Sequence, residues 1–125
     1  MNILLINSFT LPISILRNAL LKKEIKRGMP LNYPMSVMTL AAYVRTRISD
    51  INISILDANY EAHKYYYDKN SKPINVCDFI KKILDINEFE PNIVGTSILV
   101  SPGHTSSLMI AEAVKKKWPT AVTVM

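Results

Sequence analysis

The chain has 125 residues, of which 49% are apolar and 20% are charged, and its formal net charge is +5. This length suits one domain, and the apolar fraction predicts a folded core instead of a disordered chain. One cysteine and two histidines exclude a disulfide framework and any multi-cysteine metal centre held by this chain alone. No apolar run reaches ~18 residues, and the N-terminus lacks signal-peptide features, so we expect a cytoplasmic protein without a membrane span.

Four short apolar runs predict β-strands. They cover residues 3–6, 51–56, 92–98 and 120–125, and a proline precedes each of the last two. Continuous apolar runs of this length are typical of strands buried on both faces, as in parallel sheets.

Helical periodicity fills the intervals between these runs. Apolar residues spaced three and four apart predict helices over residues 37–48, 76–84 and 107–118. Ser36 and Asn75 precede the first two helices and are their expected N-caps. The stripe of the first helix contains Val37, Leu40, Ala41, Val44 and Ile48. The third ends at a proline, which cannot continue a helix.

The helix over residues 76–84 carries further expectations. Cys77 falls on its expected core side, and Asp78 and Lys82 have the spacing of an ion pair on its solvent side. Two other segments have weaker patterns. Residues 13–26 suit a helix capped by Ser14 but have a broken apolar stripe. Residues 61–72 read as a long connection with a helical turn.

Strands that alternate with helices predict an α/β fold with right-handed crossovers. The expected architecture is a flavodoxin-like, doubly wound parallel sheet with the strand order 2-1-3-4. Such sheets bind ligands beyond the carboxyl ends of the strands, where the strand order reverses. That point lies between strands 1 and 3, so the loops to inspect span residues 7–11, 57–61 and 99–105.

Small polar residues concentrate at these strand ends. The candidates for ligand binding are Asn7, Ser8, Asp57, Asn59, Ser97, Ser101, Gly103 and Thr105. Hydroxyls and free amides at the start of a helix suit a polar or anionic ligand, and a glycine permits close approach of a backbone. Ordinary structural roles stay open, because Thr105 or His104 would also cap the helix and Asp57 would also form a turn.

Several established site patterns are absent. The first loop lacks the Gly-x-Gly-x-x-Gly pattern of nicotinamide-binding proteins, and no P-loop or nucleophile elbow occurs. The acidic cluster and acceptor Asp of a response regulator are replaced by Asn7, Ser8 and Ser97. A flavodoxin-like binding domain stays open, although Ser8 and Thr10 offer few hydroxyls for a phosphate loop.

Four stretches together resemble the N-terminal cobalamin-binding domain of radical S-adenosylmethionine enzymes. Residues 2–7 are similar to the family's first strand, and residues 34–45 to its Pro-x-Gly-Leu-x-x-Leu-Ala-Ala-Tyr-Leu-Arg helix, with Ser36 in place of glycine. Residues 55–61 resemble its Leu-Asp-Ala-x-x-Glu strand end, and residues 91–97 its Pro-Asp-Ile-Val-Gly-x-Ser strand. The resemblance covers nearly the whole chain.

The resemblance implies that the chain binds cobalamin with its nucleotide base displaced from cobalt. The tail would be held at the carboxyl ends of strands 1 and 3, where Ser97 and Leu99 match a Ser-x-Leu step. The Asp-x-His-x-x-Gly motif that supplies a lower cobalt ligand in other cobalamin domains is absent. His63 and His104 are the chain's two histidines, and neither lies in that motif, so no metal ligand is assigned and these two stay open as weak candidates for binding cobalt.

The resemblance also implies an incomplete domain over residues 1–125. The family's domain continues into a Gly-Gly loop and a fifth strand, and neither occurs here. The Cys-x-x-x-Cys-x-x-Cys motif that holds a [4Fe-4S] cluster and works with S-adenosylmethionine is also absent. We therefore expect the cluster in a separate downstream domain, and no catalysis by this chain alone.

The sequence also leaves other functions and partners open. The same fold would serve as a ligand-free interaction module. Residues 22–27 are rich in Lys and Arg and residues 65–67 are all tyrosine, but a solvated basic face and tyrosine packing are more common than nucleic-acid binding. The run 120–125 would form an unpaired edge strand, so we expect self-association there.

Overall fold

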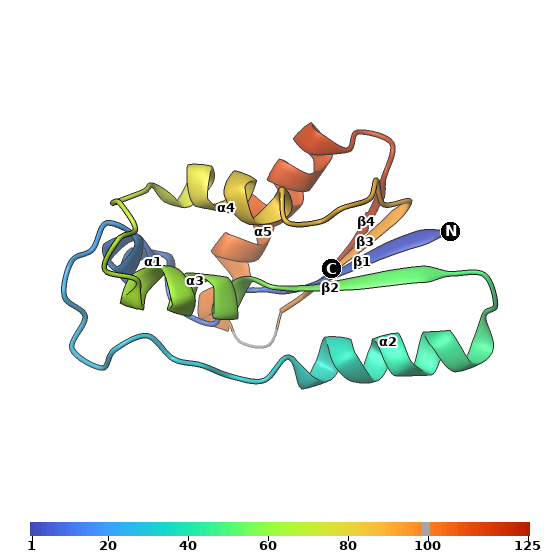
Figure 1. Cartoon of the computed structure of the whole chain (residues 1–125), viewed down its shortest axis with the longest axis horizontal. Coiled ribbons are helices and arrows are strands. Elements are labelled where there is room, and N and C mark those ends of the chain that lie inside the picture. The colour runs from blue at the N-terminus through green and yellow to red at the C-terminus, as the bar shows by residue number, and fades with distance from the viewer. Residues whose placement is uncertain (99–100) are drawn as a thin grey trace.

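The computed structural model describes residues 1–98 and 101–125, and at residue 101 it describes the backbone (Figure 1). In chain order the elements are β1 (Asn2–Asn7), α1 (Ile13–Leu20), α2 (Met35–Arg47), β2 (Asn52–Asp57), α3 (Ala58–Tyr67), α4 (Val76–Leu84), β3 (Ile93–Ser97), the 3-10 turn η1 (Ser101–Gly103), α5 (His104–Lys117) and β4 (Val122–Val124). No helix among the described residues is both long and apolar enough to cross a membrane.

The four strands form one parallel sheet in the order β2-β1-β3-β4. This is the flavodoxin-like, doubly wound α/β arrangement, and it confirms the predicted fold and strand order. The register places Asn7 beside Asp57 on one neighbouring strand and beside Ser97 on the other. The carboxyl ends of three strands therefore present three polar side chains in one row.

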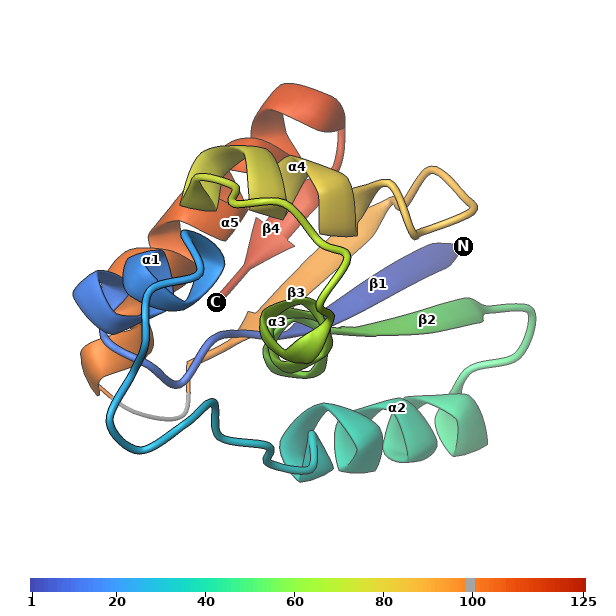
Figure 2. The same cartoon turned by 60° about the vertical axis from the view of Figure 1, so that its left-hand side comes forward.

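The two faces of the sheet are covered unequally. Figure 2 shows α2 by itself on one side, with α1, α4 and α5 on the other. Because side chains alternate along a strand, Leu4 and Ile6 face the larger group of helices, whereas Ile3 and Leu5 face α2. Two separate apolar clusters follow, and the one beneath α2 is much smaller.

The larger cluster has an aromatic centre. Phe79 of α4 is 1% exposed and packs against Phe9 and Tyr65, with ring centroids 6.2 Å and 5.3 Å away. Phe9 belongs to the loop after β1, and Tyr65 lies near the end of α3. These contacts hold two of the loops at the carboxyl edge of the sheet against the core.

Of the three N-cap residues predicted from the sequence, one caps its helix and two lie inside their helices. The Asn75 side chain accepts a hydrogen bond from the Asp78 backbone N–H at 2.8 Å, as predicted. The prediction for Ser36 was wrong, because α2 begins at Met35 and Ser36 lies inside its first turn. Ser14 likewise lies within α1, which follows Pro12, and that helix ends at Leu20, before the basic run.

Helix α3 occupies most of the segment that was predicted as a connection. The Asp57 side chain caps its start by accepting from the Tyr60 backbone N–H at 3.2 Å, and Glu61 pairs with Lys64 at 3.1 Å. The helix has few apolar residues at helical spacing, so its pattern predicted a loop. Capping and tertiary contacts stabilise it instead.

Lys22 makes the tertiary contact at the far end of α3. Its Nζ donates to the backbone carbonyls of Tyr65, Tyr66 and Asp68, which a helix end leaves without partners. Burial lowers the pKa of the Lys22 ammonium, and the Asp68 carboxylate partly offsets this effect. A residue predicted to lie on a solvated basic face thus closes the end of a helix.

Five other side chains differ from their predicted positions or partners. Cys77 lies at the edge of the apolar stripe of α4 and is exposed. Asp78 bonds to Asn75 instead of Lys82, and the Lys82 ammonium lies over the Tyr65 ring. On α2, Leu40 and Ile48 are 49% and 46% exposed because that helix covers only part of its side of the sheet.

Candidate functional site

Hydrogen bonds join the three strand ends across the sheet. The Ser97 hydroxyl donates to Asn7 Oδ1 at 3.3 Å, and Asn7 Nδ2 donates to Asp57 Oδ1 at 2.9 Å. Asn7 is 1% exposed, whereas Ser97 is partly exposed. The predicted convergence of these residues is therefore present, and Asp57 and Ser97, which are both partly exposed, are the two residues of this row that a ligand can reach.

Asn59 binds the chain itself. It is fully buried, its Nδ2 donates to Thr10 Oγ1 at 3.0 Å, and its Oδ1 accepts from the Thr10 backbone N–H at 3.3 Å. Both ends of the amide are thus used to hold the loop after β1. Thr10 was not predicted as a partner, and no local pattern in the sequence connects residues 49 positions apart.

Ser8 and Gly103 bring the loop after β1 into direct contact with the start of α5. Ser107 donates to the Gly103 carbonyl at 2.9 Å, so the 2.5 Å contact between Ser8 and Ser107 is a hydrogen bond donated by Ser8. A Cβ on Gly103 would lie 2.3 Å from the Phe9 carbonyl oxygen. The glycine permits a close approach, as predicted, but the group that approaches is the protein's own backbone.

A groove of about 190 Å³ lies between α2 and the face of the sheet. Its lining comprises Leu5, Ser36, Val37, Leu40, Gly95, Thr96, Ser97, Val124 and Met125. The groove runs along residues 95–97 of β3, and Ser97 is the last residue of that strand. The side chains of these three residues are small, which leaves space for the groove. Val124 and Met125, which also line the groove, are 53% and 56% exposed, because no helix within residues 1–98 and 101–125 covers them.

The other predicted site residues lie apart from this groove. Thr105 and His104 are exposed in the first turn of α5, and neither caps that helix, whose N-cap is Gly103. His63 packs against the Tyr67 ring, with centroids 4.8 Å apart. Leu99 and the side chain of Ser101 lie outside the described residues. In the described parts of the chain, no group of three His, Cys, Asp or Glu residues is placed to hold a metal ion.

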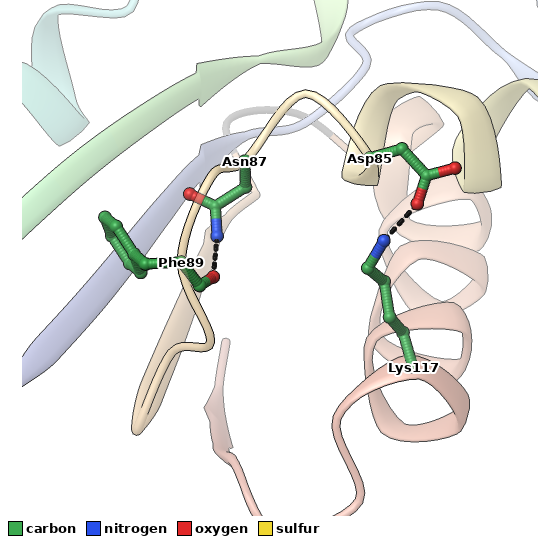
Figure 3. Close-up of polar contacts among 4 residues, drawn as sticks. All are labelled: Asp85, Asn87, Phe89 and Lys117. Atoms are coloured by element: carbon green, nitrogen blue, oxygen red, sulfur yellow. Dashed lines mark hydrogen bonds and ion pairs between the residues drawn. The ribbon is translucent and has the colours of Figure 1, made fainter.

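Two larger hollows lie on the opposite side of the sheet from α2. One of about 370 Å³ lies between α4 and α5, and the Asp85–Lys117 ion pair joins the ends of the two helices there (Figure 3). Asn87 donates to the Phe89 carbonyl in the loop that follows α4. The other, of about 740 Å³, lies between α3, α4 and their connection. Neither contains a predicted site residue.

No family model, curated protein or solved structure matches this chain. The functional assignment therefore depends on the residues and on their arrangement.

Proposed function

We propose that this chain is a cytoplasmic cobalamin-binding module. The observation that carries the proposal is the groove beside Ser97, at the carboxyl end of a central strand of a doubly wound sheet. Ligands of such sheets bind at the carboxyl ends of strands, next to the point where the strand order reverses. The four sequence stretches that resemble cobalamin-binding domains include seven of the nine residues that line this groove, and Val124 and Met125 lie outside them.

The groove has the composition that a nucleotide tail needs. Leu5 and Val37 offer apolar walls to a flat aromatic base, and Ser97 offers a hydroxyl to the polar part of the tail. Gly95 contributes no side chain, so the surface of β3 stays open at that point. The apolar walls, the small residues and the Ser97 hydroxyl oxygen, which is left to accept because its proton goes to Asn7, therefore fit the tail of the cofactor.

The residues around the groove have separate roles in this proposal. Ser97 binds the tail, and Asn7 and Asp57 hold Ser97 in position through the hydrogen bonds across the strand ends. Bound cobalamin supplies a cobalt centre that accepts and releases a methyl group. Neither His63 nor His104 lines the groove. The radical chemistry belongs to a separate domain.

Titration with hydroxocobalamin tests the proposal. We expect a saturable change in the visible absorbance of the cofactor on adding the protein. Ser97→Leu fills the groove and is expected to weaken binding at least tenfold, about 1.4 kcal/mol. Thr39→Leu, an exposed threonine of α2 outside the groove, is the matched control and should leave binding unchanged. The absence of a spectral change at high protein concentration, or equal binding by the Ser97→Leu variant, would refute the proposal.

A ligand-free interaction module is the second candidate function. It is favoured by the closure of the β1 loop onto α5, where Ser8 pairs with Ser107 and Gly103 contacts Phe9. These contacts occupy polar groups that the sequence predicted to bind a ligand. The same titration separates the two functions, because this candidate predicts a folded protein that leaves the cobalamin spectrum unchanged.

Self-association through β4 is also part of the proposal. The Val122 backbone N–H donates to Asn92 next to β3, so the N–H of Thr123 points toward the open side of the strand. An edge of this kind pairs with other strands. We expect light scattering to show a mass that rises with concentration, and Thr123→Pro to abolish that rise by removing the outward donor. A monomer at all concentrations would contradict this.

A further inference from the structure

Helix α2 exposes large apolar side chains on the sides that do not face the sheet. Val37 and Ala41 face the sheet and are buried, but Met35, Met38 and Tyr43 face elsewhere and are 63%, 47% and 55% exposed. The sheet covers one side of α2, and among the residues that the structure describes no other helix packs on its remaining sides (Figures 1 and 2).

The exposed apolar surface continues into the segment that leads into α2. Leu31 and Tyr33 are 56% and 86% exposed, and the Met35 backbone N–H donates to the Tyr33 carbonyl. We call Leu31, Tyr33, Met35, Met38 and Tyr43 the α2 surface. Together they expose on the order of 600 Å², if each large side chain offers roughly 150–220 Å². That is the upper end of apolar patches on monomers and approaches the ~800 Å² per partner of a stable interface.

The charged residues within the stretch 25–49 all have one sign, although Glu24 and Asp50 border this stretch. From Ile25 to Ser49 the chain has no Asp or Glu, and it has four basic residues: Lys26, Arg27, Arg45 and Arg47. All four are exposed, and none forms an ion pair within the described parts of the chain. The Arg47 guanidinium lies over the Tyr43 ring, 4.6 Å from its centroid. Basic groups therefore flank the apolar surface at both ends.

Exposed apolar side chains together with basic residues favour one class of partner. A membrane-surface helix needs one strongly apolar and one strongly polar face, and α2 does not separate them, since Thr39 and Thr46 also lie on its exposed side. A nucleic acid needs a continuous basic track, which the apolar surface interrupts. A second copy that docks through the same residues 25–49 would bring the same basic charges and no carboxylate from that stretch. An acidic protein surface satisfies both the apolar and the basic groups.

We propose that the α2 surface binds an acidic protein partner, through a partner helix whose apolar stripe is flanked by carboxylates. The apolar stripe covers Met35, Met38 and Tyr43, and the carboxylates meet Arg27 and Arg47. This interface uses none of the groove residues, so a test of partner binding at the α2 surface is independent of the test of cobalamin binding.

Selection from a displayed library of helical peptides of about five turns tests the proposal. The intact chain is the bait, and peptides that also bind a Met38→Glu/Tyr43→Glu bait are removed. We expect enriched peptides to carry apolar residues at three- and four-residue spacing and an excess of Asp and Glu. A representative peptide should bind at least tenfold more weakly to Met38→Glu or to Arg47→Glu. Ile86→Glu and Leu108→Glu, at sites 51% and 45% exposed elsewhere, are matched controls that should leave affinity within twofold.

Four outcomes would overturn the proposal. In the first, no peptide is enriched. In the second, the enriched peptides are neutral or basic, or they bind the control variants as weakly as the α2 variants. In the third, vesicles of anionic lipid or a single-stranded oligonucleotide, but no peptide, bind in a way that Met38→Glu abolishes. In the fourth, the intact chain dimerises and Met38→Glu alone restores the monomer, which would assign the surface to a second copy.

Discussion

Gly103→Ala is expected to lower the free energy of unfolding by about 3 kcal/mol. The added Cβ would lie 2.3 Å from the Phe9 carbonyl oxygen, far inside van der Waals contact. Both sides of this contact are backbone, so no flexible side chain can move aside. Phe9 is 2% exposed and packs on Phe79, so the β1 loop can shift only by disturbing the core. Denaturant unfolding followed by circular dichroism measures the loss.

Gly95→Ala is the matched control for this substitution. Its Cβ would lie 3.0 Å from Leu5 Cδ2, the end of a side chain that can rotate away. Alanine is also favoured over glycine in a strand by roughly 0.5–1 kcal/mol, which offsets part of the crowding. We expect its stability to stay within about 1 kcal/mol of the parent. Equal losses for the two variants would show that the close approach at Gly103 is not the cause.

Phe79→Ala is expected to cost about 3–5 kcal/mol of unfolding free energy. The ring is 1% exposed, and its loss would leave a cavity between Phe9 and Tyr65. Because stabilities of single domains are commonly 5–15 kcal/mol, this loss would bring the protein close to unfolding at room temperature. The measurement is the unfolding midpoint in urea.

Two control variants test whether the lost packing of the Phe79 ring causes this decrease in the free energy of unfolding. Phe79→Leu keeps an apolar side chain in place and should recover more than half of the stability. Ile86→Ala removes apolar atoms from a side chain that is 51% exposed and should cost less than about 1 kcal/mol. A Phe79→Ala variant as stable as Ile86→Ala would contradict the assignment of this ring to the centre of the core.

Much of the fold follows from local pattern. Four apolar runs and the helices between them predict a parallel sheet, and right-handed crossovers leave few strand orders to consider. The order β2-β1-β3-β4 and the Asn75 cap are both present. The start of α5 lies three residues before the predicted one, because its first turn is polar and continues directly from η1.

Elements that depend on tertiary contacts were not predictable in this way. Helix α3 is held at one end by Asp57 and at the other by Lys22, whose bonding partners lie more than forty positions away along the chain. Leu40 continues the apolar stripe of α2 in the sequence, which predicts burial. In the structure its side chain is 49% exposed. Periodicity finds the apolar residues of a helix and leaves open how wide a face the neighbouring elements cover.

The candidate site was predictable in its position and only partly in its residues. Loop geometry placed Asn7, Asp57 and Ser97 together, because carboxyl ends of parallel strands share one edge. Ser8 and Asn59 also lie there, but each bonds to a partner of its own chain, Ser107 and Thr10. A polar residue with an internal partner has the same appearance in a sequence as one that awaits a ligand.

The hydrogen bonds across the strand ends have a direction. Asp57 accepts at its carboxylate, which fixes the amide of Asn7 with its nitrogen toward Asp57 and its oxygen toward Ser97. The single proton of the Ser97 hydroxyl is therefore directed to Asn7, and its lone pairs are left for other partners. A ligand that donates to Ser97 adds to the row of bonds, whereas one that only accepts must compete with a buried amide. The polarity of the row thus discriminates between ligands of the same shape, in favour of those that present an N–H or O–H to the end of β3.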